Sequence, residues 1–238
     1  MMEGAEMPQN LFPSPPWPTL PVQGERARYP LHRIFCVGKN YAAHAAEMGG
    51  DVDREQPIFF TKSALAFLPS GLESNYPPGT ESYHYEVEFC VVLGKPLFKA
   101  SPEEAADAIY GYAVGLDMTR RDIQNRSKEL RLPWDMAKDV EESAIIGPIT
   151  RKADFGPVTD QRIRLRLDGE LRQDGPLSDM VWSVPELLSR LSGLYHLAPG
   201  DLLMTGTPAG VGPVKPGDHL VGDVEGLAPV SVTFTDPD

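Results

Sequence analysis

Apolar and polar residues alternate along several short stretches of the chain, which is the pattern of half-buried β-strands. The clearest case is residues 161–167, where isoleucine and leucine alternate with arginine. An Asp168-Gly169 turn follows, so residues 170–173 are predicted to return as the second strand of a hairpin. Continuous apolar runs predict further, buried strands. The predicted strands cover residues 31–37, 57–61, 83–94, 111–118, 145–149, 161–167, 170–173, 201–205, 215–225 and 230–235.

Few segments show the helical period. Residues 183–194 place apolar side chains three and four positions apart, after a serine suited to cap a helix. Residues 101–110 begin with Ser-Pro-Glu-Glu, which is also a helix start. Further helices are predicted at 41–48, which is short, and at 119–130, and residues 136–143 are predicted to be a loop. Because strands outnumber helices and do not alternate with them regularly, the pattern predicts an α+β fold rich in β-structure.

Composition places the chain among ordinary globular proteins. It has 238 residues, of which 41% are hydrophobic and 24% charged, enough for one sizeable core. Residues 1–30 are rich in proline with Phe12, Trp17 and Leu20 interspersed, and are predicted to be an extended arm or cap. The main domain is expected to comprise residues 31–238.

The net charge of −12 limits the classes of partner. It argues against binding to nucleic acid or to an anionic membrane surface. A small anionic substrate stays compatible, because a cation and a few local Lys or Arg can reverse the charge inside a pocket. We expect a cytoplasmic protein, since the first residues lack the apolar core of a signal peptide and no apolar run reaches the roughly 18 residues of a membrane span. Cys36 and Cys90 lie in apolar runs and are expected to be reduced.

Two glutamates stand out within the predicted strand at residues 83–94. Side chains alternate along a strand, so Glu86 and Glu88 should share one face, and Val87 and Phe89 the other. Neighbouring carboxylates repel each other, and a cation such as Mg²⁺, Mn²⁺ or Ca²⁺ between them relieves this repulsion. The alternative is a solvated strand face. Asp117, at the end of another apolar run, could add a third oxygen ligand or could cap the following helix.

Other candidate residues could handle protons or bind anions. His44 and Glu47 are three apart on a predicted helix, where a carboxylate can orient an imidazole base, although a surface pair has the same spacing. Arg121 could grip a carboxylate or form a surface ion pair. Lys62 and Lys138, the latter in the predicted loop, could stabilise an oxyanion or could be solvated.

The glycine-rich stretch at residues 206–212 could present backbone N–H groups and a hydroxyl to an anion. It lacks the Gly-Lys-Ser/Thr of a nucleotide-binding loop, and the chain has neither a Gly-x-Gly-x-x-Gly dinucleotide motif after a strand nor a Gly-x-Ser-x-Gly elbow. These absences argue against nucleotide-dependent enzymes and serine hydrolases.

Taken together, these stretches resemble the fumarylacetoacetate hydrolase family, over about residue 31 to the end of the chain. The matching segments are Cys-Val-Gly-Lys-Asn-Tyr-Ala-Ala-His-Ala-Ala-Glu at 36–47, Phe-Phe-Thr-Lys at 59–62, Tyr-Glu-Val-Glu-Phe at 85–89, Asp-Met-Thr-Arg-Arg-Asp-Ile-Gln at 117–124 and Gly-Asp-Leu-Leu-Met-Thr-Gly-Thr-Pro-Ala-Gly-Val-Gly at 200–212. Their order is that of the family. Ser63, where many relatives have proline, and Phe89, where leucine is usual, are departures that leave the polar set intact.

The resemblance implies a mixed β-sandwich or roll with short peripheral helices, and usually a homodimer. It implies a Mg²⁺ or Mn²⁺ ion held by Glu86, Glu88 and Asp117. It also implies a water-activating pair of His44 and Glu47. Lys138 would stabilise an enolate, and the substrate would be held by Arg121, Gln124 and Thr207, with Lys62 as a further contact.

The segments around Asp117 and Lys138, with the proline-rich arm, look most like the fumarylpyruvate hydrolase branch of the family, which serves the gentisate pathway of aromatic catabolism. That branch implies hydrolysis of a carbon–carbon bond in an acylpyruvate, most simply fumarylpyruvate to fumarate and pyruvate. Decarboxylation of oxaloacetate and isomerisation of an oxo-dienoate would use the same apparatus. A non-enzymatic, metal-stabilised binding module is the third reading.

Overall fold

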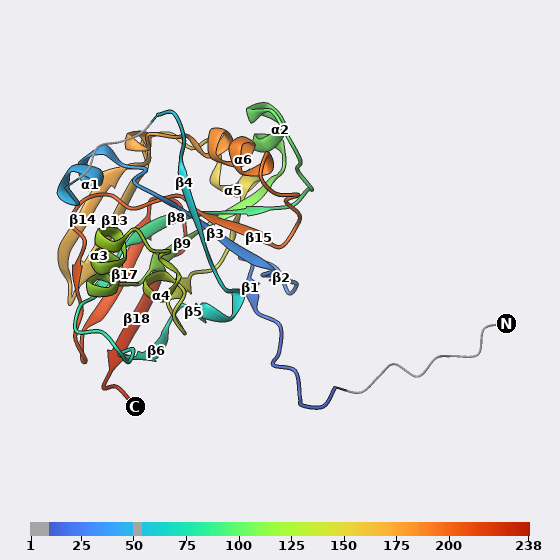
Figure 1. The fold of residues 1–238 in the computed structure, drawn as a ribbon. Helices are drawn as coiled ribbons and strands as arrows, with labels where there is room; N and C mark the ends of the chain where they lie inside the picture. Colours follow the sequence, from blue (N-terminus) through green and yellow to red (C-terminus); the bar gives the residue numbers. More distant parts are fainter. Residues whose placement is uncertain (1–9, 50–53) are drawn as a thin grey trace.

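The computed structural model describes residues 10–49 and 54–238 of the chain. An eight-stranded sheet forms the centre of this region (Figure 1). Its strand order is β4-β3-β15-β8-β9-β11-β5, and β12 pairs with β9. The bounds are β3 Arg33–Gly38, β4 Ile58–Lys62, β5 Phe67–Pro69, β8 Val87–Leu93, β9 Ile109–Asp117, β11 Ala144–Ile146, β12 Thr150–Arg151 and β15 Asp201–Met204.

A five-stranded sheet packs on one face of the central sheet. Its order is β14 Glu170–Pro176, β13 Arg162–Leu167, β17 His219–Val224, β18 Val230–Thr235 and β6 Leu72–Asn75. The predicted hairpin is its β13–β14 pair, and Ile163 and Leu165 of β13 enter the same buried cluster as Phe89 and Val91 of β8. The apolar side chains at alternate positions of these strands therefore fill the space between the two sheets.

A short hairpin covers the other face of the central sheet. It consists of β1 Thr19–Pro21 and β2 Arg28–Pro30, and its Leu20 and Tyr29 pack in a second buried cluster with Cys90 and Val92 of β8. Strand β8 is thus buried on both faces, which explains why its sequence is almost continuously apolar. Tyr29 also donates a hydrogen bond to Leu93 O at 2.7 Å, which ties the hairpin to that strand.

The predicted strand at 83–94 divides into two strands at Glu86. Residues Tyr83–Tyr85 form β7, which pairs with β10 Thr119–Arg120 and β16 Gly212–Pro213 in a small three-stranded sheet. The chain then crosses into the central sheet as β8. The expectation of one continuous strand was wrong here, because residues on the two sides of Glu86 find their backbone partners in different sheets.

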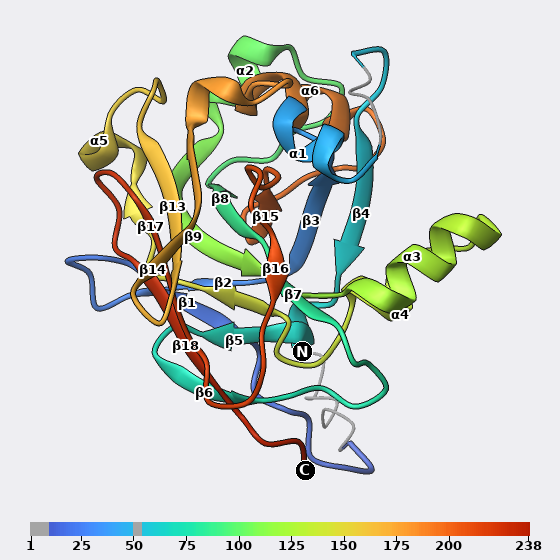
Figure 2. The same ribbon diagram turned by 90° about the vertical axis from the view of Figure 1, so that its left-hand side faces the viewer.

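Short helices lie around the sheets, as Figures 1 and 2 show. They are α1 Ala42–Glu47, α2 Pro102–Asp107, α3 Arg121–Leu130, α4 Asp135–Lys138, α5 Lys152–Phe155 and α6 Val184–Ser192, with 3-10 turns at Ala64–Ala66 and Leu177–Asp179. The β-rich α+β fold predicted from the sequence is confirmed. The predicted loop at 136–143 is corrected, since Lys138 ends α4. No helix within the described parts of the chain is long and apolar enough to cross a membrane.

Because β8 is buried on both faces, we expect its apolar side chains to contribute strongly to stability. Phe89 is fully buried and stacks on Tyr112 with ring centroids 5.0 Å apart. Phe89→Ala should lower the free energy of unfolding by about 3–5 kcal/mol, because it leaves a cavity that the rigid sheets cannot close. Urea unfolding followed by circular dichroism measures this change. Phe98→Ala, at a side chain that is 48% exposed, is the control and should cost less than about 1 kcal/mol. Equal losses for the two variants would contradict the packing described here.

Candidate active site

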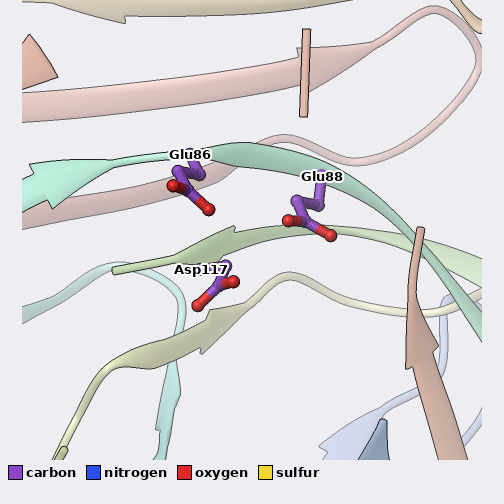
Figure 3. A group of neighbouring side chains, drawn as sticks. All are labelled: Glu86, Glu88 and Asp117. Carbon is purple, nitrogen blue, oxygen red and sulfur yellow. The ribbon is translucent and has the colours of Figure 1, made fainter. Parts of the chain in front are cut away.

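Three carboxylates meet where the chain passes from β7 into β8. Glu86 occupies the junction, Glu88 lies on β8, and Asp117 ends the neighbouring strand β9. The Asp117 N–H donates to Glu86 O at 2.9 Å, which fixes the two backbones side by side. The three side chains lie next to one another (Figure 3), one oxygen of each lies within 4.8 Å of the others, and all three residues are buried. The sequence-based expectation that these residues converge is met in space, although Glu86 does not belong to a continuous strand.

Basic side chains surround the acids. Lys138 Nζ lies 2.7 Å from Glu86 Oε2 and 2.6 Å from Asp117 Oδ2. The Arg121 guanidinium pairs with Glu86 Oε1, and Lys62 Nζ lies 2.9 Å from Asp117 Oδ1. Three formal negative charges therefore face three formal positive charges. Unpaired ions are costly to bury, and this balance allows the cluster to exist in the interior.

The environments of the two glutamates differ in charge. Burial alone would raise the pKa of Glu86, but Lys138 and Arg121 outweigh burial and hold its pKa well below the ordinary value. Burial, reinforced by the charges of Asp117 and Glu86, raises the pKa of Glu88 well above the ordinary value. Glu88 makes no ion pair with any described residue and accepts a hydrogen bond from Gly206 N at 2.7 Å. Among the three acids, Glu88 is thus the one whose charge this chain does not neutralise by a direct ion pair.

The donor set fits a divalent cation. Lys62 directs its hydrogen bonds to Met118 O, Lys138 O and Ser143 Oγ, so Asp117 Oδ1 lies close to the ammonium but has no aligned hydrogen-bond donor. A buried carboxylate oxygen without a hydrogen bond is costly, and a metal ion would satisfy it. Carboxylate oxygens are the ligands that Mg²⁺ and Mn²⁺ prefer. Glu86, Glu88 and Asp117 would hold such an ion.

A small cavity opens beside the three acids. Its walls include His44, Glu86, Glu88, Arg121, Gln124, Lys138 and Thr207, and its volume of about 30 Å³ is that of roughly one water molecule. A much larger hollow of about 1260 Å³ lies between α2, α5 and the start of α6. That hollow is mostly apolar and contains none of the acids. Size favours the larger hollow, but the convergence of acids, bases and an imidazole favours the small cavity as the reactive one.

His44 lines this cavity, and Glu47 lies next to His44. Both belong to α1, and His44 Nδ1 is 3.4 Å from Glu47 Oε2, which is long for a hydrogen bond. Burial lowers the pKa of His44 below its ordinary value, so the ring is neutral at pH 7 and can accept a proton. The Glu47 carboxylate also accepts from Gly210 N at 3.1 Å, which joins α1 to the glycine-rich loop. The predicted pair is therefore assembled beside the acids.

Arg121, Gln124 and Thr207 complete the polar wall. Arg121 donates to Gln124 Oε1 at 2.6 Å, one helical turn away on α3. Asp117 does not cap α3, because the residue that precedes this helix is Arg120. The alternative reading of Asp117 as a capping residue is therefore excluded. Lys62, predicted to be a further substrate contact, is not among the residues that line this cavity, and its ammonium lies against Asp117 Oδ1.

Several contributors were not predicted from the sequence. Gln173 is fully buried and donates to Thr207 Oγ1 and Pro208 O, both at 2.8 Å, while accepting from Val87 N at 3.0 Å. It thus holds the glycine-rich loop against the start of β8. Its neighbours in sequence carry no motif that marks it.

Lys39 and Lys128 also line the cavity and were not predicted as site residues. Both bring positive charge to the cavity, and burial together with Arg121 lowers the pKa of Lys128 to about 8.

Known proteins resemble this chain over most of its length. Residues 33–235 match the family model described as fumarylacetoacetate hydrolase C-terminal. The fumarylpyruvate hydrolase of Ralstonia sp is 45% identical over 189 residues, which cover 78% of this chain and 97% of that protein. The mitochondrial oxaloacetate tautomerase of Homo sapiens is 42% identical over 202 residues, or 84% of this chain and 90% of that protein.

A solved structure has the same fold as this chain and contains a divalent metal ion. The fumarylpyruvate hydrolase of Pseudomonas aeruginosa, in complex with Mn²⁺ and pyruvate, superposes with a TM-score of 0.92 at 44% identity, covering 95% of this chain and 99% of that one. Together with the buried acidic cluster, this similarity supports a divalent-metal site in the present chain. The fold, the motifs and the matched length lead to one conclusion: the chain belongs to the fumarylacetoacetate hydrolase family.

Proposed function

We propose that this protein is a metal-dependent hydrolase that cleaves the carbon–carbon bond of an acylpyruvate. The substrate that we favour is fumarylpyruvate, which would yield fumarate and pyruvate. The observation that carries the proposal is that Glu86, Glu88, His44 and Lys138 line one cavity, with Asp117 grouped with the two glutamates and paired with Lys138. The similarity to two fumarylpyruvate hydrolases, one of them bound to Mn²⁺ and pyruvate, supports this choice.

Binding of the substrate is assigned to groups that carry positive charge or donate hydrogen bonds. A divalent ion held by the three acids would act as a Lewis acid toward the oxygens of the keto acid. We assign Arg121 and Gln124, which line the cavity, to the binding of a substrate carboxylate, and Thr207 lines the same cavity. The cavity has room for about one water in this structure, so side chains at the rim, such as Lys39 and Met48, have to move to admit a keto acid.

The proton transfers are assigned to His44. Neutral His44, oriented by Glu47, takes a proton from the water that adds to the C4 carbonyl of the substrate. The C3–C4 bond then breaks, and its electron pair passes to the pyruvate fragment as an enolate. Lys138 presents its ammonium group to that developing negative charge. Protonation at C3 gives pyruvate, and the acyl fragment leaves as a carboxylic acid, so the reaction consumes one water.

Tautomerisation of oxaloacetate is the second candidate, favoured by the 42% identity to the human enzyme. That reaction moves a proton at C3 of a related keto acid and breaks no carbon–carbon bond. His44 and Lys138 could serve both reactions, because each passes through an enol or enolate. Decarboxylation and isomerisation of keto acids use the same electron sink. The geometry of the acids alone does not separate these reactions, whereas their products do.

A comparison of substrates with and without metal tests the proposal. The purified protein, with Mn²⁺ or Mg²⁺, should convert fumarylpyruvate to fumarate and pyruvate faster than it converts acetylpyruvate, tautomerises oxaloacetate or isomerises an oxo-dienoate. Product formation is followed by chromatography, with release of carbon dioxide measured separately. A chelator should abolish turnover, because the acids then lack the ion that polarises the substrate. Full activity in chelator would refute the metal role, and exclusive action on oxaloacetate would select the second candidate.

Replacing the imidazole tests its role as a base. His44→Ala should reduce kcat/KM by about 10²–10⁴-fold while leaving the Kd for Mn²⁺ within roughly threefold, since His44 lies outside the three acids. Because burial lowers the pKa of His44, the wild-type rate should persist down to pH 6.5 and fall only at lower pH, as the ring gains a proton. Stopped-flow rates across the pH range measure both effects.

The control for this variant is His219→Ala, which removes an exposed histidine that does not line the cavity. It should match the wild type in rate and in pH dependence. Unchanged turnover in His44→Ala would remove this residue from the proton transfer.

A further inference from the structure

Lys62 is a buried cation that the proposed chemistry leaves without a role. It ends β4, its side chain is fully buried, its ammonium lies 2.9 Å from Asp117 Oδ1, and it is not among the residues that line the cavity. Lys138 contacts the other oxygen of the same carboxylate. Asp117 therefore contacts one cation that lines the cavity and one that does not.

A count of charges shows what this second cation changes. The acids contribute three negative charges, and Lys62, Arg121 and Lys138 contribute three positive ones, so the cluster is formally neutral. A divalent ion brings two further positive charges, and a keto acid brings negative charge. Without Lys62 the cluster would carry one negative charge before the metal enters.

We propose that Lys62 is a positioning residue that acts through Asp117 to weaken binding of the metal alone and to strengthen binding of the anionic keto acid to the metal-loaded site. The inference rests on the proposed metal site. Like charges repel and opposite charges attract, and in a buried site these interactions are screened little. The positive charge of Lys62 thus opposes the metal, draws electron density from Asp117, and leaves the loaded site more attractive to an anion.

A purely structural role for Lys62 makes the opposite prediction for the metal. Lys62 donates to Met118 O and Ser143 Oγ at 3.1 and 2.8 Å, and also to Lys138 O, so it ties β4 to the segments that carry Asp117 and Lys138. If only this tie mattered, its loss would loosen the acids and weaken both the metal and the anion. The sign of the change in metal affinity therefore separates the two roles.

The test uses Lys62→Met, which keeps the length of the side chain and removes its charge, and Lys62→Gln, which keeps some hydrogen bonding. Titration with Mn²⁺, followed by electron paramagnetic resonance of the free ion, gives the metal Kd. Calorimetric titration of the Mn²⁺-saturated protein with pyruvate gives the anion Kd. In both variants we expect Mn²⁺ to bind about tenfold or more tightly and pyruvate about tenfold or more weakly. Proton uptake by an acid would offset only part of the first change, because a proton carries half the charge of the metal.

Ser143→Ala is the matched control, because it removes a hydrogen-bond partner of Lys62 and keeps the charge. Both of its affinities should stay within roughly threefold of wild type, and thermal melting verifies that each variant is folded. Weaker binding of both ligands in the Lys62 variants, or no change in either, would overturn the inference. Wild-type protein that binds no Mn²⁺ would instead overturn the proposed metal site itself, so the two failures are distinguishable.

Discussion

The organisation of this protein depends on compensating buried charge. Glu86, Glu88 and Asp117 lie in the interior, where an isolated carboxylate costs several kcal/mol. The compensating cations come from parts of the chain that are far apart in sequence: β4 supplies Lys62, α3 supplies Arg121 and α4 supplies Lys138. The elements around the site are therefore held to one another by charges as well as by apolar contacts. Glu88, which has no ion pair with a described residue, is where the balance favours an added cation.

The position of this charged cluster follows from how the strands are covered. Two apolar layers bury β8 on both faces, but the residues on the other side of Glu86 form β7, which belongs to a different sheet. At that junction backbone and side chains no longer need to fill an apolar layer, and polar groups can gather. Gln173 stabilises the junction by bonding to the backbone of Val87 and to Thr207. A change of sheet thus creates the space that the acids use.

The parts of this arrangement that could be predicted are those with a local signal. Alternation marked β13, and a capping serine marked α2 and α6. The spacing of Glu86 and Glu88 indicated a shared function, and family resemblance grouped them with Asp117. The break at Glu86 could not be predicted, because residues on both sides favour strand and only their partners differ. The role of Gln173 is likewise invisible in sequence, since it arises from contacts across the fold.

Lys62 shows most clearly where local reasoning ends. Its sequence context, Phe-Phe-Thr-Lys, indicates only a lysine at the end of an apolar strand, and such a residue can equally reach a ligand or the solvent. In the fold its side chain is buried, its hydrogen bonds go to three neighbouring segments, and its ammonium lies 2.9 Å from Asp117 Oδ1. The whole chain carries a net charge of −12, yet Arg121, Lys138, Lys39 and Lys128 at the cavity create a positive environment for an anion. The charge that a substrate meets is therefore set by the few residues folded around the acids, and the net charge of the protein has little bearing on it.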